Sequence, residues 1–108
     1  MKRNRYIING KFEKLAEKEN FTIFTVSPNL LLSTELDGNF ILFDSKRGVR
    51  YLIDDYDVHD TSEDVEEYGG IMREDLLGLC DIDRIIMSAW RAFDSEDNDV
   101  TQEEVYAY

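Results

Sequence analysis

Strand-like runs separated by turn signals fill the first half of the chain, and this pattern constrains the fold more than any other feature. The runs are rich in β-branched and aromatic residues and cover residues 21–26, 30–36, 39–44 and 49–53. Turn-forming residues lie between them at Ser27-Pro28-Asn29, at Asp37-Gly38 and at 45–48. Asp-Gly between two such runs is typical of a two-residue hairpin loop. The pattern therefore predicts a three- to four-stranded antiparallel meander.

A short N-terminal helix is expected before the meander. Within residues 11–19, Phe12, Leu15 and Ala16 fall on one side of a helix. Residues 6–8 are apolar and are suited to a short strand ahead of that helix.

The strongest helical pattern lies in the second half, after Asp81, a residue type suited to cap a helix N-terminus. Apolar residues recur there at helical spacing, and they are Ile82, Ile85, Ile86, Ala89, Trp90 and Phe93. A weaker helix is expected after Thr61 and Ser62, ending at Gly69-Gly70. The chain is therefore predicted to form a single α+β domain, residues 1–108, with its C-terminal helices packed on one face of the sheet.

Acidic residues are concentrated in the second half. Residues 54–108 contain eighteen Asp and Glu but only three Arg, whereas residues 1–53 carry a net charge of +3, and the whole chain carries −12. Charge of this size does not specify a fold, but it favours a cationic partner and rapid, salt-sensitive association. Direct binding of nucleic acid is not expected, because phosphates are bound by Lys and Arg gathered on a shared face.

The densest acidic segment, residues 54–67, contains eight acids and no base. Like charges four residues apart on a helix cost roughly a few tenths of a kcal/mol per pair, a cost that a cationic partner relieves. Tyr51, Tyr56 and Tyr68 lie among or beside the acids and are suited to anchor an interface. The nominated partner-binding residues are Asp54, Asp55, Asp57, Asp60, Glu63, Asp64, Glu66, Glu67, Tyr56 and Tyr68. A solvated loop and a metal site are the alternative interpretations of this segment.

Residues 89–105 resemble the end of the first helix of an EF-hand and its calcium loop, with the second acidic run, residues 94–104, in the place of the loop. Oxygen-bearing residues match loop positions 1, 3 and 5 and the closing Glu, and they are Asp94, Glu96, Asn98 and Glu104. The run is one residue shorter than a twelve-residue loop, and Asp99 stands where the turn needs Gly. A simpler interpretation is a capping box, in which Thr101 begins a short final helix.

No motif for catalysis, a disulfide or a bound cofactor is present. Cys80 is the single cysteine, and its apolar neighbours predict a buried thiol. His59 is the single histidine and has no Ser or Cys nucleophile suited to it nearby, so we expect no enzymatic activity and no metal or cofactor. No apolar run approaches the roughly 20 residues of a membrane helix, and none follows the basic N-terminus. We therefore expect no signal peptide, no membrane partner and action in the cytoplasm of a bacterial host cell.

The size, the charge layout and the predicted order of helix, meander and acidic C-terminal half resemble those of small phage-encoded anti-CRISPR proteins. Some members of that class cover the PAM-reading and DNA-binding surface of Cas9 with clustered carboxylates. The resemblance implies a non-enzymatic inhibitor that acts by DNA mimicry, presenting residues 54–67 to Arg and Lys that normally read the PAM or contact phosphates.

Two other functions are compatible with the same residues. An immunity or adaptor protein would use the acidic face to neutralise a basic toxin, such as a nuclease, without imitating duplex geometry. A calcium-responsive module would use residues 94–104. The sequence predicts neither the strand order nor the oligomeric state.

Overall fold

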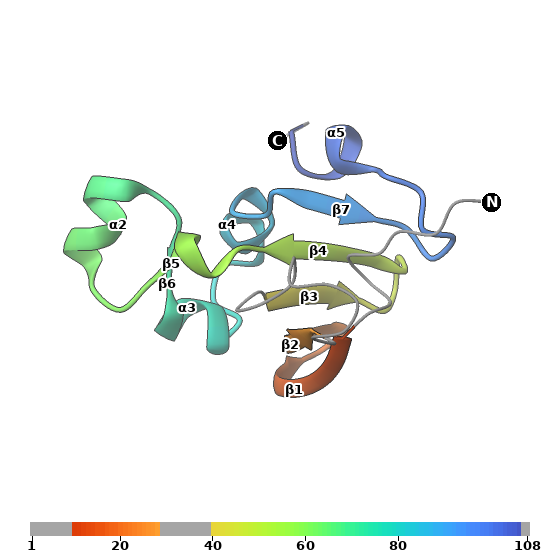
Figure 1. Cartoon of the computed structure of the whole chain (residues 1–108), viewed down its shortest axis with the longest axis horizontal. Helices are drawn as coiled ribbons and strands as arrows, with labels where there is room; N and C mark the ends of the chain where they lie inside the picture. The colour runs from red at the N-terminus through yellow and green to blue at the C-terminus, as the bar shows by residue number, and fades with distance from the viewer. Residues whose placement is uncertain (1–9, 29–39, 107–108) are drawn as a thin grey trace.

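A five-stranded antiparallel sheet forms the body of the computed structural model, which describes residues 10–28 and 40–106 (Figure 1). The strands are β1 (Gly10–Lys18), β2 (Phe21–Pro28), β3 (Phe40–Asp44), β4 (Val49–Ile53) and β7 (Arg91–Phe93), hydrogen-bonded in the order β1-β2-β3-β4-β7. Neighbours along the chain pair from β1 to β4, so the predicted antiparallel meander and the α+β class are confirmed. The strand predicted at 6–8, the strand predicted at 30–36 and the Asp37-Gly38 hairpin turn lie outside the described residues.

The N-terminal helix predicted over residues 11–19 is wrong, because this segment is strand β1. A β-bulge at Leu15 interrupts its pairing with β2 between Lys14 and Ala16. The extra residue breaks the two-residue alternation of side chains, so Phe12 contacts Phe24 on one face of the sheet while Ala16 packs into the core on the other. The resulting spacing of apolar residues imitates a helical period.

The central strands β3 and β4 are buried on both faces of the sheet. One face carries the main core, in which side chains of β2, β3, β4 and β7 meet buried residues of the helices, among them Leu76, Ile85 and Ile86. On the other face, a smaller buried cluster consists of Ile41, Leu52 and Phe93. Burial on both faces explains why β3 and β4 are almost continuously apolar.

Short helices and a two-stranded parallel pair occupy the second half of the chain. The elements are the 3-10 helix η1 (Asp55–Asp57), β5 (Val58–His59), α2 (Ser62–Tyr68), β6 (Ile71–Met72), α3 (Arg73–Leu77), α4 (Ile82–Met87) and α5 (Thr101–Glu104), with β5 paired to β6. In the part of the chain that the structure describes, no helix is long and apolar enough to cross a membrane, since the longest has seven residues.

Helix α4 is shorter than the apolar pattern predicts. Asp81 begins it as expected, because its carboxylate accepts a hydrogen bond from the backbone N–H of Arg84 at 3.3 Å. The helix ends at Met87, and the next residues join the sheet, with Trp90 N–H donating to the Leu52 carbonyl at 3.0 Å. Trp90 and Phe93 therefore match the helical spacing by coincidence, because Phe93 belongs to strand β7 and Trp90 directly precedes it.

The outer edge of β7 is closed by the chain that follows it. The backbone N–H of Val100 donates to the Ala92 carbonyl at 2.9 Å, and the Ala92 N–H donates to the buried Thr101 hydroxyl at 3.0 Å. The Thr101 hydroxyl thus accepts the hydrogen bond that the carbonyl of a neighbouring strand would otherwise accept from Ala92. Pairing of this edge with another chain is blocked.

Replacing Thr101 should destabilise the fold measurably. Thr101→Val keeps the shape but removes the hydroxyl, which leaves the buried N–H of Ala92 without its acceptor. We expect a loss of about 1–3 kcal/mol in the free energy of unfolding, or roughly 5–15 °C in Tm, measured by thermal denaturation. Thr101→Ser retains the hydroxyl and serves as the control. Equal melting temperatures for the two variants would contradict the role assigned to this hydrogen bond.

Candidate acidic interface

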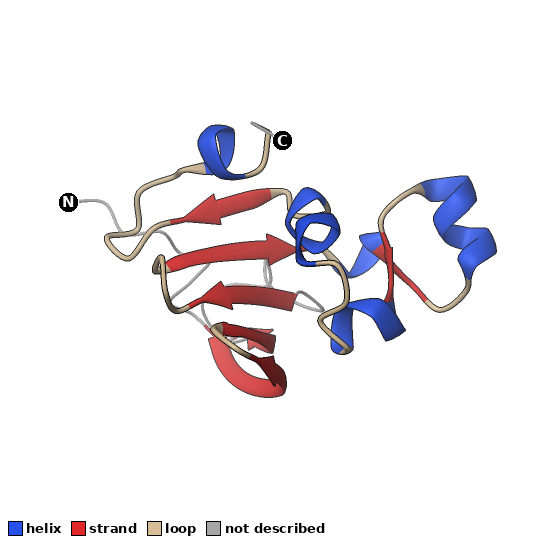
Figure 2. Cartoon of the chain, turned by 180° about the vertical axis from the view of Figure 1, so that it is seen from behind, coloured by secondary structure: helices blue, strands red, loops and turns tan. Residues whose placement is uncertain are grey.

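The nominated acids lie on a projection that we name the acidic lobe, residues 54–72. It comprises η1, β5, α2 and β6 and extends beyond one end of the five-stranded sheet, with α2 outermost (Figures 1 and 2). Both views, from opposite sides, place α2 away from the sheet. The fold therefore presents this segment at an extremity of the molecule.

Local hydrogen bonds explain where the elements of the lobe begin and end. The Asp54 carboxylate accepts from the Tyr56 N–H at 3.0 Å at the start of η1, and the Thr61 hydroxyl accepts from the Asp64 N–H at 3.2 Å at the start of α2. This confirms Thr61 as the N-cap. Gly69 and Gly70 follow the helix with φ of +81° and +84°, values that favour glycine.

Gly70 also allows the closest backbone approach in the lobe. A Cβ at this position would lie 2.1 Å from the carbonyl oxygen of Asp57, a distance that no side chain can tolerate. At Gly69, by contrast, a Cβ would meet nothing within 4 Å. Gly70 thus holds the end of α2 and the start of β6 against η1.

The fold supplies the acidic cluster with a base that its own sequence lacks. Arg73, at the start of α3, contacts the Asp60 carboxylate at 3.0 Å and the Asp55 carboxylate at 3.8 Å. Its guanidinium also lies 5.7 Å from the centre of the Phe40 ring. Two of the eight nominated acids are therefore already paired within the chain. The sequence did not reveal this role of Arg73, because Arg73 follows the cluster by several residues. Only the pairing of β5 with β6 brings Arg73 close to Asp55 and Asp60.

The acids of α2 are different, because none of them forms an ion pair with any residue that the structure describes. They are Glu63, Asp64, Glu66 and Glu67. The helix N-terminus favours the first two, but Glu66 and Glu67 lie in the last turn, where the helix dipole opposes negative charge and no basic residue is present. Glu63 and Glu67 also repel each other across one turn. Helix α2 therefore carries four carboxylates that no basic residue of the described chain pairs with.

The three tyrosines near the acids have different environments. Tyr56 is 88% exposed and Tyr68 is 66% exposed, so both are accessible aromatic side chains within the lobe. Tyr51 is fully buried in the main core, so the prediction that it anchors an interface is wrong. The Tyr68 ring lies 6.0 Å from the His59 ring, which places the only histidine beside α2.

The surroundings of Asp57 disfavour its ionised carboxylate. Burial, and next the neighbouring Asp54 carboxylate, raise the pKa of Asp57 above its ordinary value of 3.8, while His59 acts in the opposite direction. Asp57 is therefore less suited to an exposed charge contact than the acids of α2.

The second acidic run is largely satisfied by the chain itself. Asp94 accepts hydrogen bonds from the backbone N–H groups of Glu96 and Asn98, both at 2.9 Å, and from the Asn98 side chain at 3.0 Å, and these bonds lower the pKa of Asp94. Arg50 donates to the Asp94 carbonyl at 2.6 Å and to the Asp97 carboxylate at 2.5 Å. A guanidinium thus already lies among the oxygens of this loop.

The structure corrects one detail of the EF-hand comparison and also the capping box predicted for the same run. The residues that lead into Asp94 form strand β7 and not a helix. Helix α5 is present, but Val100 is its N-cap without a side-chain hydrogen bond, so the predicted capping box at Thr101 is wrong. Among residues 10–28 and 40–106, no group of three or more His, Cys, Asp or Glu is arranged to hold a metal ion. The calcium-responsive alternative stays a prediction.

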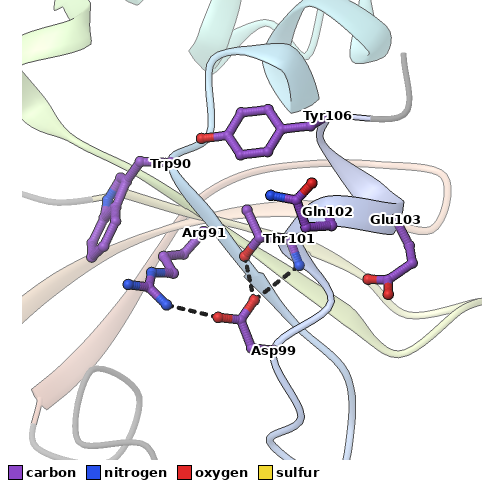
Figure 3. Close-up of a pocket in the computed structure, with 7 residues that line it drawn as sticks. All are labelled: Trp90, Arg91, Asp99, Thr101, Gln102, Glu103 and Tyr106. Carbon is purple, nitrogen blue, oxygen red and sulfur yellow. Dashed lines mark hydrogen bonds and ion pairs between the residues drawn. The ribbon is translucent and has the colours of Figure 1, made fainter.

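A cavity of about 550 Å³ lies beside β7 and α5 (Figure 3). Arg91 donates to the Asp99 carboxylate at 2.7 Å, and Asp99 in turn accepts from the Thr101 N–H and hydroxyl. The Arg91 guanidinium lies 5.6 Å from the centre of the Trp90 ring, and Tyr106 lines the opposite part of the cavity. Two of the charged side chains in its wall, Arg91 and Asp99, are therefore bound to each other, while the third, Glu103, forms no ion pair with a described residue.

Cys80 is exposed, which corrects the prediction of a buried thiol. The apolar neighbour that enters the core is Leu79, at 2% exposure. Leu79 and Asp81 both have left-handed φ values, 52° and 56°, so the chain turns sharply on either side of Cys80. Leu79 is therefore buried while the adjacent Cys80 is exposed.

No protein-family model, no curated protein and no solved structure matches this chain.

The two glycines after α2 allow the packing of the lobe to be tested. Gly69→Ala should cost about 1–3 kcal/mol from its positive φ alone. Gly70→Ala carries the same conformational cost and the clash with the Asp57 carbonyl, so its loss in the free energy of unfolding should be clearly larger. Urea denaturation of both variants measures the difference. Equal losses would show that the close approach at Gly70 is unimportant.

Asp57 gives a prediction for pH dependence. Its raised pKa means that the ionised carboxylate destabilises the fold, and that the fold gains stability as pH falls through the pKa of Asp57 in the folded state. Asp57→Asn should therefore raise Tm at pH 7, and its advantage should shrink as the pH falls toward 3.8. Thermal melts over this pH range measure the effect.

Asp99 is the control of opposite sign. Its hydrogen bonds with Thr101 and the Arg91 guanidinium lower the pKa of Asp99, so its ionised form stabilises the fold above the unfolded-state value of 3.8. Asp99→Asn should lower Tm at pH 7, and that deficit should fade as the pH drops through the lowered pKa. A shift of the same sign for both variants would refute the assignment.

Proposed function

We propose that this protein is a non-enzymatic inhibitor that binds the cationic nucleic-acid-binding surface of a partner protein through the acidic lobe. The observation that carries the proposal is the set of carboxylates on α2, at the end of the lobe farthest from the sheet, which form no ion pair with any residue that the structure describes. They remain uncompensated while arginines of the same chain neutralise other acids. Self-repulsion of this kind is relieved when Arg and Lys of a partner approach.

The lobe combines the two properties that a protein interface of this kind needs. Its carboxylates attract a basic surface and raise the rate of encounter. Tyr56 and Tyr68 provide exposed aromatic area close to the acids, and aromatic side chains carry much of the binding energy in interfaces. A partner surface that normally contacts phosphates would then be covered, and nucleic acid would be excluded by competition. A Cas9-type effector in a bacterial host has a surface of this kind.

Neutralising the acids of α2 should weaken competition with DNA. The variant Glu63→Gln/Asp64→Asn/Glu66→Gln/Glu67→Gln removes four charges and leaves Arg73 and its partners intact. The measurement is release of bacterial proteins from immobilised duplex DNA, or release of fluorescent target DNA from a nuclease-inactive Cas9–guide complex. We expect the variant to need about tenfold more protein than the wild type, equivalent to about 1.4 kcal/mol.

The matched control changes the net charge equally outside the lobe. Glu13→Gln/Glu19→Gln/Glu96→Gln/Glu103→Gln also removes four exposed carboxylates. It should compete like the wild type apart from a small general effect of net charge. Equal weakening of both variants would show that net charge, and not the lobe, drives binding.

The immunity or adaptor function is the second candidate, and the exposed Tyr56 and Tyr68 favour it. Aromatic anchors belong to protein–protein contacts in general and do not require duplex-like geometry. The same displacement assay separates the two functions. A partner that loses activity but stays on DNA at saturating inhibitor supports neutralisation without mimicry and overturns DNA mimicry.

A further inference from the structure

A second cavity, of about 320 Å³, lies between α2, α3 and α4 at the base of the acidic lobe. Its apolar lining comes from Val65, Ile71 and Met72. Ligand pockets range from roughly 300 to 1,000 Å³, so this volume suits a single side chain better than a large ligand.

Three carboxylates from three different elements line the same cavity. They are Glu66 of α2, Asp75 of α3 and Asp81, the N-cap of α4. None of the three forms an ion pair within the described residues. Arg84 also lines the cavity, and its guanidinium donates to the Gly70 carbonyl at 3.2 Å. The lining therefore carries three negative charges and one positive charge.

We propose that this cavity receives one arginine side chain of the partner protein. The aliphatic part of arginine would lie on the apolar lining, and long cationic side chains bury their stems in this way. The guanidinium has five N–H donors in a fixed plane, which lets it contact carboxylates that come from different elements. Anionic ligands are disfavoured by the net negative charge of the lining. The cavity would be the anchor point of the inhibitor on its partner, so this proposal rests on the proposed function.

The first test uses Nα-acetyl-arginine amide as the probe, added to isotope-labelled full-length protein and followed by NMR. We expect saturable shifts at Ile71 and Met72, and no such shifts with Nα-acetyl-norleucine amide, which has the stem without the charge. Glu66→Gln/Asp81→Asn should weaken probe binding by about fivefold or more. Asn is a good N-cap and tolerates the left-handed φ of 56° at position 81, so α4 should persist in this variant.

The control Glu63→Gln/Asp83→Asn removes the same charge from the same two helices, at positions outside the cavity lining. It should leave probe affinity within about twofold of the wild type, because exposed charges act weakly at a distance. Absence of saturable shifts, equal shifts with the norleucine amide, or equal loss in both double variants would each overturn the proposal.

Cys80 lines the cavity and gives a second measurement that needs no charge change. It is the only cysteine of the chain, so N-ethylmaleimide modifies one site. The adduct should obstruct the cavity and weaken probe binding by about fivefold or more, whereas Cys80→Ser treated with the same reagent should bind normally. Full probe affinity of the adduct would overturn the assignment.

The two proposals fail in different ways. If arginine amide binds in the cavity but the protein never displaces a partner from DNA, the proposed function is wrong. The cavity is then an arginine site, but it does not anchor an inhibitor of DNA binding. If displacement depends on the acids of α2 but is unchanged by the N-ethylmaleimide adduct at Cys80, the proposed function holds and the cavity is not the anchor point.

Discussion

Pairing of β4 with β3 on one side and β7 on the other is the constraint on which the rest of the structure depends. Tyr51, Leu52 and Ile53 are fully buried, so β4 is fixed on both faces and both edges. Residues 54–90 leave the sheet after Ile53 and return where the Trp90 N–H donates to the Leu52 carbonyl. The acidic lobe, α3 and α4 therefore form one excursion whose two ends are held at the same place on β4.

Charge compensation in the fold is uneven in a way that the sequence does not reveal. The second acidic run receives arginines from the sheet and its turns, in the pairs Arg47–Glu104, Arg50–Asp97 and Arg91–Asp99. Among the described residues, the acids of the acidic lobe form ion pairs only with Arg73, which binds Asp55 and Asp60. Among the described residues, three of the six acids in the second run thus pair with three arginines, whereas only two of the eight acids in residues 54–67 are paired, and both share Arg73. This difference, more than the net charge of −12, is the reason we propose α2 as a contact surface.

Local signals predicted the elements whose local and tertiary preferences agree. Strands β2, β3 and β4 combine β-rich composition with turn residues, and the Thr61 and Asp81 caps act within three residues of themselves. The failures have a common cause. The bulge at Leu15 and the pairing of β7 with β4 are decided by partners distant in sequence, and both segments happened to have helix-like apolar spacing. The pairing of Arg73 and the cavity beside Cys80 depend on the same long-range arrangement, so no local pattern could reveal them.

The acids of the lobe divide into two groups with different physical roles. Asp55 and Asp60 bind Arg73, and together with the close approach of Gly70 to Asp57 they hold η1, β5 and β6 together. These contacts support α2, so its carboxylates, which form no ion pair with a described residue, are held in place without a partner. Binding of the proposed partner would then avoid much of the entropy cost of ordering a flexible acidic segment. A disordered acidic tail would offer the same charge without this advantage, which is a physical reason for carrying the charge on a folded lobe.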